Sequence, residues 1–172
     1  LMTKPRWCLG MAATRRHTFG NLVGHVKAVT NMKSLASWTN EQFDPTLNWE
    51  DIAWVKKQWG GKLILKGIMD VEDAKLAVAS GADAIVVSNH GGRQLDGAPS
   101  SIEALPAIVA AVGDQIEVWM DGGIRSGQDV LKAWALGAKG VMIGRAMVYG
   151  LGAMGEAGVT KALQIIHKEL DV

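Results

Sequence analysis

A nine-residue stretch places a histidine and an arginine three positions apart, on either side of two glycines. The stretch is Ser88-Asn89-His90-Gly91-Gly92-Arg93-Gln94-Leu95-Asp96. Imidazole titrates near neutrality, so His90 can serve as a general base. The glycines permit a tight turn that brings Arg93 near it, and a guanidinium can bind a carboxylate through two parallel hydrogen bonds. The pair predicts proton transfer on a small carboxylic acid; a loop histidine bonded to backbone is the alternative.

Two glycine-arginine stretches could hold a phosphate group. The first is Asp121-Gly122-Gly123-Ile124-Arg125, which leads into a predicted helix, and the second is Gly144-Arg145. Glycines let backbone N–H groups approach an anion, arginine offers a forked donor, and a helix N-terminus attracts negative charge. Two such stretches after neighbouring strands predict a phosphate site, although turn glycines beside solvated arginines would give the same pattern.

Lys66 ends a predicted buried strand. A lysine in this position can form a Schiff base or provide a counter-charge for an anionic cofactor, and its spacing leaves both roles open. The spacing of the histidines, the acids and the single cysteine, Cys8, predicts no metal site.

Short apolar segments that alternate with amphipathic ones must position these residues. The predicted strands are 62–66, 83–88, 116–121 and 140–144, and the predicted helices are 49–59, with Asn48 as N-cap, 71–80, 102–112, 127–136 and 156–170. Each strand is apolar on both faces, which is typical of a covered parallel sheet. The alternation predicts an α/β fold.

The position of the candidate residues favours one of two parallel architectures. No GxGxxG follows the first predicted strand, which argues against a dinucleotide-binding open sheet. The candidate residues stand at the carboxyl ends of successive strands, as in a (β/α)8 TIM barrel, which needs about 250 residues. Residues 48–172 are therefore predicted to supply about the last four βα units of a barrel.

Composition narrows the classes of protein. The chain has 172 residues, is 48% hydrophobic and carries a net charge of +1, so one domain is expected and nucleic acid is not an expected partner. A single cysteine predicts a reducing compartment, the cytoplasm. The sequence contains no apolar run long enough to cross a bilayer and does not begin like a signal peptide.

The first part of the chain differs from the rest in charge. Residues 1–40 hold six Lys or Arg and no acid, and five of the seven tryptophans fall within residues 1–59. Residues 1–47 are predicted to form a basic, Trp-containing loop or arm. Peripheral contact with an anionic membrane face is the alternative.

The strings around Lys66, His90, Asp121 and Gly144 together resemble the FMN-dependent α-hydroxy-acid oxidases and dehydrogenases. That family includes glycolate oxidase, L-lactate dehydrogenase and mandelate dehydrogenase. SNHGGRQLD is among its most specific strings, and all four motifs occur in the family's order. The resemblance covers about residues 35–172, and residues 43–51 are most similar to the bacterial L-lactate dehydrogenase branch.

The resemblance implies a role for each candidate residue. Lys66 would stabilise the negative charge of reduced FMN beside flavin N1 and O2, and Ser88 would help to hold the flavin. His90 would take a proton from a small L-2-hydroxy acid, such as L-lactate, whose carboxylate Arg93 would bind. The ribityl chain and phosphate would be held by a larger set, namely Asp121, Gly122, Gly123, Arg125, Gly144 and Arg145.

The resemblance also implies a homo-oligomer and an N-terminal half of the barrel that these 172 residues do not contain. Family tyrosines from that half are missing, since the only tyrosine is Tyr149. Two further hypotheses follow. One is a phosphate-binding barrel isomerase or lyase, such as an FMN-dependent isopentenyl diphosphate isomerase. The other is a non-catalytic half-barrel.

Overall fold

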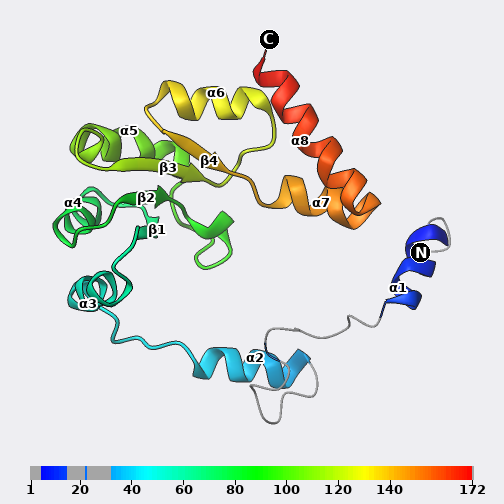
Figure 1. Cartoon of the computed structure of the whole chain (residues 1–172), viewed down its shortest axis with the longest axis horizontal. Coiled ribbons are helices and arrows are strands. Elements are labelled where there is room, and N and C mark those ends of the chain that lie inside the picture. Colours follow the sequence, from blue (N-terminus) through cyan, green and yellow to red (C-terminus); the bar gives the residue numbers. More distant parts are fainter. Residues whose placement is uncertain (1–4, 15–21, 23–31, 172) are drawn as a thin grey trace. The chain divides into compact units, whose positions relative to one another are not determined.

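The computed structural model describes residues 5–14, 22 and 32–171. The chain divides into two compact units, Leu1–Leu47 and Asn48–Val172. The first contains helices α1 (Pro5–Ala13) and α2 (Met32–Glu41) (Figure 1). Hydrophobic periodicity predicted neither helix. In α1, Arg6 is the only charged residue, so no polar face distinguishes it as an amphipathic helix.

The second unit is built on a four-stranded parallel sheet in the order β1-β2-β3-β4. The strands are β1 (Ile64–Ile68), β2 (Ala84–Val87), β3 (Glu117–Asp121) and β4 (Gly140–Met142). The α-helices are α3 (Trp49–Trp59), α4 (Val71–Ala79), α5 (Ser101–Val112), α6 (Gly127–Ala135), α7 (Arg145–Met154) and α8 (Glu156–Leu170). Helices α4, α5 and α6 lie on the same side of the sheet (Figure 1).

This arrangement confirms the predicted α/β fold, since every predicted strand and helix is present with ends within two residues. Asn48 is the N-cap of α3 and forms a capping box with Asp51. In the second unit two elements were not predicted, α7 and the 3-10 turn η1 (His90–Gly92). Helix α7 contains two glycines, which weaken a helix signal in sequence. Within the part of the chain described, no helix has the length and apolar character needed to cross a bilayer.

One face of the sheet forms the hydrophobic core with the helices. Strand β2 is buried along its whole length, and Ile85 and Val118 are neighbours in register on this face. They pack in one cluster with Leu105 and Ile108 of α5. Removing a large apolar side chain from such a cluster typically costs about 2–5 kcal/mol, so this core fixes the strands that carry the site.

The opposite face of the sheet carries polar side chains toward its carboxyl edge. Lys66, Val86 and Trp119 are neighbours in register, so their side chains leave the sheet on the same face. Ser88 and Asp121 lie two residues beyond Val86 and Trp119 and share that face.

A bulge in β1 separates this polar face from the core. The register between β1 and β2 is irregular between Lys66 and Ile68, and the intervening Gly67 has φ 99°. Ile68 consequently pairs with Val87 and joins the hydrophobic core, while Lys66 stays on the polar face. A non-glycine residue rarely adopts this backbone conformation, which accounts for glycine at the bulge.

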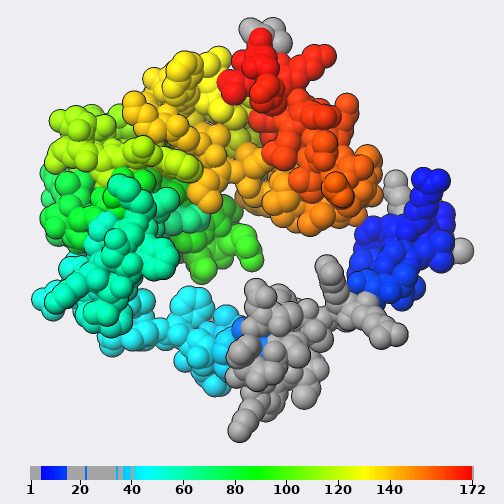
Figure 2. Space-filling model, viewed as in Figure 1, coloured from blue at the N-terminus to red at the C-terminus, as the bar shows by residue number. Residues whose placement is uncertain are grey.

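Helices α7 and α8 cross at two glycines. A Cβ built on Gly150 would lie 2.5 Å from the carbonyl oxygen of Gly158, so the two backbones are in direct contact. Gly127, at the start of α6, is equally close to the backbone at the end of α8. In the space-filling view the orange and red atoms of α7 and α8 form one continuous surface (Figure 2). Small residues at these crossings therefore fix α8 against both α6 and α7.

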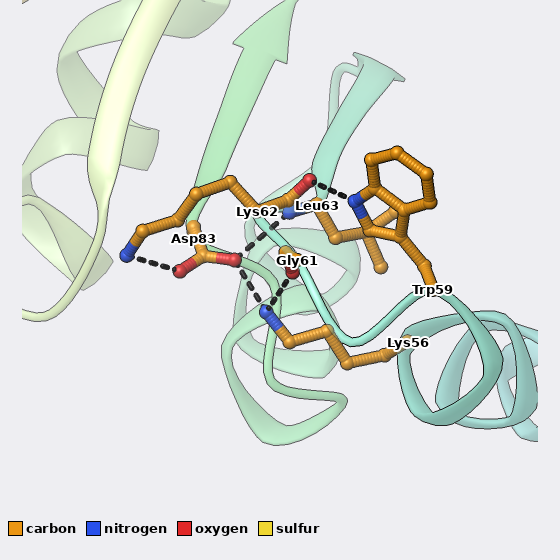
Figure 3. Close-up of polar contacts among 6 residues, drawn as sticks. All are labelled: Lys56, Trp59, Gly61, Lys62, Leu63 and Asp83. Atoms are coloured by element: carbon orange, nitrogen blue, oxygen red, sulfur yellow. Dashed lines mark hydrogen bonds and ion pairs between the residues drawn. The ribbon is translucent and has the colours of Figure 1, made fainter.

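The amino-terminal edge of the sheet holds a cluster of charges centred on Asp83 (Figure 3). The Asp83 carboxylate accepts hydrogen bonds from Lys56 Nζ at 2.5 Å, Lys62 Nζ at 2.8 Å and the Leu63 N–H at 2.9 Å. These hydrogen bonds hold the pKa of Asp83 well below its ordinary value. The cluster joins α3 to the first two strands.

Candidate active site

Three neighbouring strands bring a lysine, a serine and an aspartate together at the carboxyl edge of the sheet. Lys66 Nζ donates to Ser88 Oγ at 3.0 Å and forms an ion pair with Asp121 Oδ2 at 3.1 Å. Ser88 is only 1% exposed. The sequence placed these residues on successive strand ends, and the sheet register brings their side chains into contact.

His90 begins the turn η1 directly above this group. Its backbone N–H donates to Ser88 Oγ at 3.1 Å, so one hydroxyl contacts both Lys66 and the histidine backbone. His90 has φ 56° and is the only non-glycine residue with a positive φ in the described part of the chain. Its ring lies against Gly67, where a Cβ would be 2.8 Å from His90 Cε1. The bulge in β1 therefore makes room for the imidazole.

Arg93 closes the turn. Its backbone N–H donates to the carbonyl oxygen of His90 at 3.4 Å, and its side chain is exposed. The two intervening glycines have φ 68° and 71°, as a tight turn between His90 and Arg93 requires. The Arg93 side chain is therefore accessible to solvent, and its backbone lies one turn from that of His90.

The loop after β3 has the backbone expected of an anion-binding segment, with φ 91° at Gly122 and 83° at Gly123. Arg125 is exposed. The N-terminus of α6, however, differs from the sequence expectation. Its N–H groups are already paired within the chain, because the Glu169 carboxylate accepts from Gly127 N at 2.9 Å and Ser126 Oγ accepts from Asp129 N.

The Asp129 carboxylate adds to this internal pairing by accepting from the Arg125 N–H at 3.1 Å. Burial raises the pKa of Asp129, but the hydrogen bonds from Arg125 and Ser126 outweigh it, and the pKa lies below its ordinary value. Helix α6 is thus capped by its own chain, so its dipole is balanced by carboxylates rather than left for a ligand.

Helix α7 begins at Arg145. Its N-cap is Gly144, which has no side chain that could accept a hydrogen bond from the first N–H groups of the helix. This helix supplies the uncapped N-terminus at the site, a feature that sequence reasoning missed because α7 was not predicted. Arg145 Nη2 also donates to the carbonyl oxygen of Gly91 at 3.1 Å. The structure therefore places Arg145 against the His90 turn, a contact across 54 positions of sequence.

This fold and site belong to one class of flavoprotein. The family model for FMN-dependent dehydrogenases matches residues 1–172, and the chain belongs to that family. The match is longer than the motif resemblance over about 35–172, because the first 34 residues contain none of the recognised motifs. FMN is the cofactor of this family, and the four strands are part of its TIM barrel.

Curated relatives and solved structures agree with this assignment. The chain is 51% identical over 170 residues to L-lactate dehydrogenase of Caulobacter sp. (strain K31), covering 98% of this chain and 45% of that protein. It is 48% identical over 172 residues to L-lactate dehydrogenase of Pseudomonas syringae pv. syringae (strain B728a), covering 99% and 45%. The chain thus spans slightly less than half the length of these relatives.

Among solved structures, the monotopic membrane protein (S)-mandelate dehydrogenase has a TM-score of 0.83 and 41% identity, covering 97% of this chain and 44% of that one. Mandelate oxidase with (S)-4-hydroxymandelic acid has a TM-score of 0.76 and 50% identity, covering 80% and 38%. The relatives favour oxidation of a 2-hydroxy acid over the isomerase hypothesis.

The residues present fit FMN. Asp121 Oδ1 is a buried acceptor with no hydrogen-bond partner among the described residues. A buried carboxylate oxygen without a donor is costly, and a polyol chain supplies hydroxyl donors. The Lys66 ammonium complements an anionic ring system, and the uncapped start of α7 suits a phosphate.

Proposed function

We propose that this chain supplies the base, the carboxylate-binding arginine and most of the FMN contacts of an enzyme that oxidises L-lactate to its 2-oxo acid. The contact network that joins Lys66, Ser88, Asp121 and His90 at one edge of the sheet carries this proposal. The L-lactate dehydrogenases match 98% and 99% of this chain at 51% and 48% identity, whereas the mandelate oxidase matches 80% at 50% and the mandelate dehydrogenase 97% at 41%. Over the whole chain the similarity therefore supports L-lactate over other small L-2-hydroxy acids.

His90 takes the proton from the substrate hydroxyl, and Arg93 binds the substrate carboxylate. When bound, FMN supplies the acceptor for the two electrons that leave the substrate carbon. The Ser88 hydroxyl fixes the backbone of the base, since it accepts from the His90 N–H. His90 is exposed, but its ring lies against the Gly67 bulge, which limits its position on that side. Positioning of this kind makes proton transfer effective.

The remaining residues hold the cofactor. Lys66 would stabilise negative charge on the flavin, and Asp121 Oδ1 would accept a hydrogen bond from a ribityl hydroxyl. The phosphate would be bound by two kinds of donor. These are the backbone N–H groups of Gly122, Gly123 and Gly144 and the guanidinium groups of Arg125 and Arg145. The α7 N-terminus contributes its dipole to this set.

Anaerobic reduction of the FMN-loaded enzyme tests this function directly. L-Lactate should bleach the flavin absorbance, D-lactate should not, and (S)-mandelate should act more slowly than L-lactate. Failure of every 2-hydroxy acid to reduce a bound flavin would contradict the reaction. Faster reduction by (S)-mandelate would support oxidation of a 2-hydroxy acid but contradict L-lactate as the substrate.

We further propose that the basic segment contacts an anionic membrane surface peripherally, at the cytoplasmic face. The excess of Lys and Arg in residues 1–40 and the monotopic membrane protein among the relatives support this. Arg15 and Arg16 lie outside the described residues. Replacing both with Glu should lower sedimentation with anionic vesicles while dye-linked activity persists. Wild-type binding that is absent or independent of salt would contradict the contact. The homo-oligomer stays a prediction.

A further inference from the structure

Ser101 is a buried polar residue for which the reaction as described has no use. It is the first residue of α5 and is 3% exposed; Ser88 is the other polar residue buried to this degree in the described ranges. The N-cap of α5 is its neighbour Ser100, so Ser101 is not needed to begin the helix. Its Oγ accepts a hydrogen bond from the Asn89 N–H at 3.2 Å. The buried hydroxyl therefore faces the residue next to the proposed base.

Asn89 closes the His90 turn through its side chain. Its Oδ1 accepts from the Gly91 N–H at 3.0 Å, and its Nδ2 donates to the carbonyl oxygen of Pro99 at 3.1 Å. One amide thus ties the turn to the segment that leads into α5. Since Ser101 fixes the Asn89 backbone, the two residues act on the turn from the same side.

The turn needs such support because His90 is held at φ 56°. Non-glycine residues adopt this left-handed conformation only where surrounding contacts impose it. The Ser88 hydroxyl holds the His90 N–H on the sheet side, and Asn89 holds the Gly91 N–H on the other. Without the second contact, the His90 backbone is free to relax toward a negative φ, which would turn the imidazole away from the Gly67 bulge.

The same pair contacts the loop after β3. A Cβ on Gly122 would lie 3.1 Å from Ser101 Oγ and 3.3 Å from Asn89 Oδ1. Gly122 follows Asp121, whose carboxylate pairs with Lys66. Ser101 and Asn89 therefore occupy the space between the turn that carries the base and the strand end that carries the cofactor contacts.

We propose that Ser101 and Asn89 are positioning residues, which hold the His90 imidazole at a fixed place relative to the Asp121-Gly122 strand end. The proposal rests on the proposed function for its kinetic consequence, but the geometric claim concerns the chain alone. Loss of either contact should slow the proton transfer at saturating substrate. Neither residue is a proposed contact of the substrate carboxylate or of FMN, so the affinity for each should change little.

Ser101→Ala is the test, and Ser100→Ala is the matched control, because Ser100 is an exposed serine that makes no side-chain cap hydrogen bond. Ser101→Thr keeps the hydroxyl. Amide hydrogen exchange of residues 89–91 should be about five- to tenfold faster in Ser101→Ala, as expected for one lost hydrogen bond. The limiting rate of flavin reduction by L-lactate should fall about tenfold with an unchanged KM, and Ser101→Thr should restore it. FMN affinity, measured by flavin fluorescence, should stay within twofold of wild type.

Several outcomes would overturn the proposal. If amide hydrogen exchange of residues 89–91 is the same in Ser101→Ala and Ser100→Ala, the Ser101 hydroxyl does not hold the turn. Faster exchange with an unchanged limiting rate shows a structural role only. A limiting rate that falls together with FMN affinity shows that the pair acts through the cofactor. If the wild-type flavin is not reduced by L-lactate, the proposed function fails, and the exchange comparison still decides whether Ser101 holds the turn.

Discussion

The two edges of the sheet carry the same kind of ion pair with opposite consequences. At the amino edge, Asp83 accepts from Lys56, Lys62 and the Leu63 N–H, so both of its oxygens are satisfied within the chain (Figure 3). At the carboxyl edge, one oxygen of Asp121 pairs with Lys66, and the other is buried with no hydrogen-bond partner in the described part of the chain. A carboxylate whose oxygens are all hydrogen-bonded within the chain stabilises the fold. A buried carboxylate oxygen that lacks a donor gains one when a ligand binds, and this favours the bound state.

The largest expected effect is at the carboxyl edge. His90→Ala should lower flavin reduction by L-lactate by about 10²–10⁴-fold, the usual contribution of a general base. FMN should still bind, because most of the residues proposed to contact it lie on other strand ends. Stopped-flow reduction and a flavin titration on the same preparation provide the measurement. Equal loss of FMN would place His90 with the cofactor residues.

Arg93→Lys should have the next largest effect. The lysine keeps the charge but loses the planar fork, so the KM for L-lactate should rise about tenfold or more. The rate at saturating substrate should fall as well if the fork also orients the substrate. Steady-state kinetics at several lactate concentrations measure both quantities. Kinetics that match wild type would remove Arg93 from the substrate site.

Asp121→Asn and Asp83→Asn compare the two edges directly. Asp121→Asn should weaken FMN binding by about tenfold, because the amide lacks the charge that pairs with Lys66 and offers one acceptor in place of two. Asp83→Asn should leave FMN binding unchanged. Isothermal titration of each apoprotein with FMN decides this. Equal affinities for the two variants would show that the unpartnered oxygen does not select the cofactor.

The smallest expected effect is on stability at low pH. Because hydrogen bonds from lysines lower the Asp83 pKa below its ordinary 3.8, the folded state favours the ionised form. The contribution of ionised Asp83 to the free energy of unfolding is complete above pH 3.8. It is lost as the pH falls through the lower pKa that Asp83 has in the folded state. Asp83→Asn should lower the melting temperature at neutral pH by a few degrees. In acid, the melting temperature of the variant should depend less on pH than that of the wild type. An acid profile that parallels the wild type would show that Asp83 contributes nothing to it.

Much of this arrangement could be predicted because it depends on local pattern. Apolar runs locate the strands, and the rule that parallel strands end at one edge brings Lys66, Ser88 and Asp121 together. Contacts over long sequence separation could not be predicted. Glu169 caps the N-terminus of α6 from 42 residues away, so the contribution to anion binding expected from that helix end is taken by the chain itself. Arg145 likewise donates to the carbonyl oxygen of Gly91 across 54 positions, and hydrophobic periodicity in the sequence does not predict such a contact.

The glycine crossing of α7 and α8 also determines which mutations the enzyme can tolerate. A side chain at Gly150 or Gly158 would force the helices apart, and α7 begins at Arg145, the arginine proposed to bind phosphate. Substitutions at these two glycines should therefore be lost from a library selected for activity as completely as substitutions at the base. A library sorted only for soluble expression would lose them as well, whereas changes at His90 would survive. Comparing the two selections would separate residues retained for chemistry from residues retained because two backbones touch.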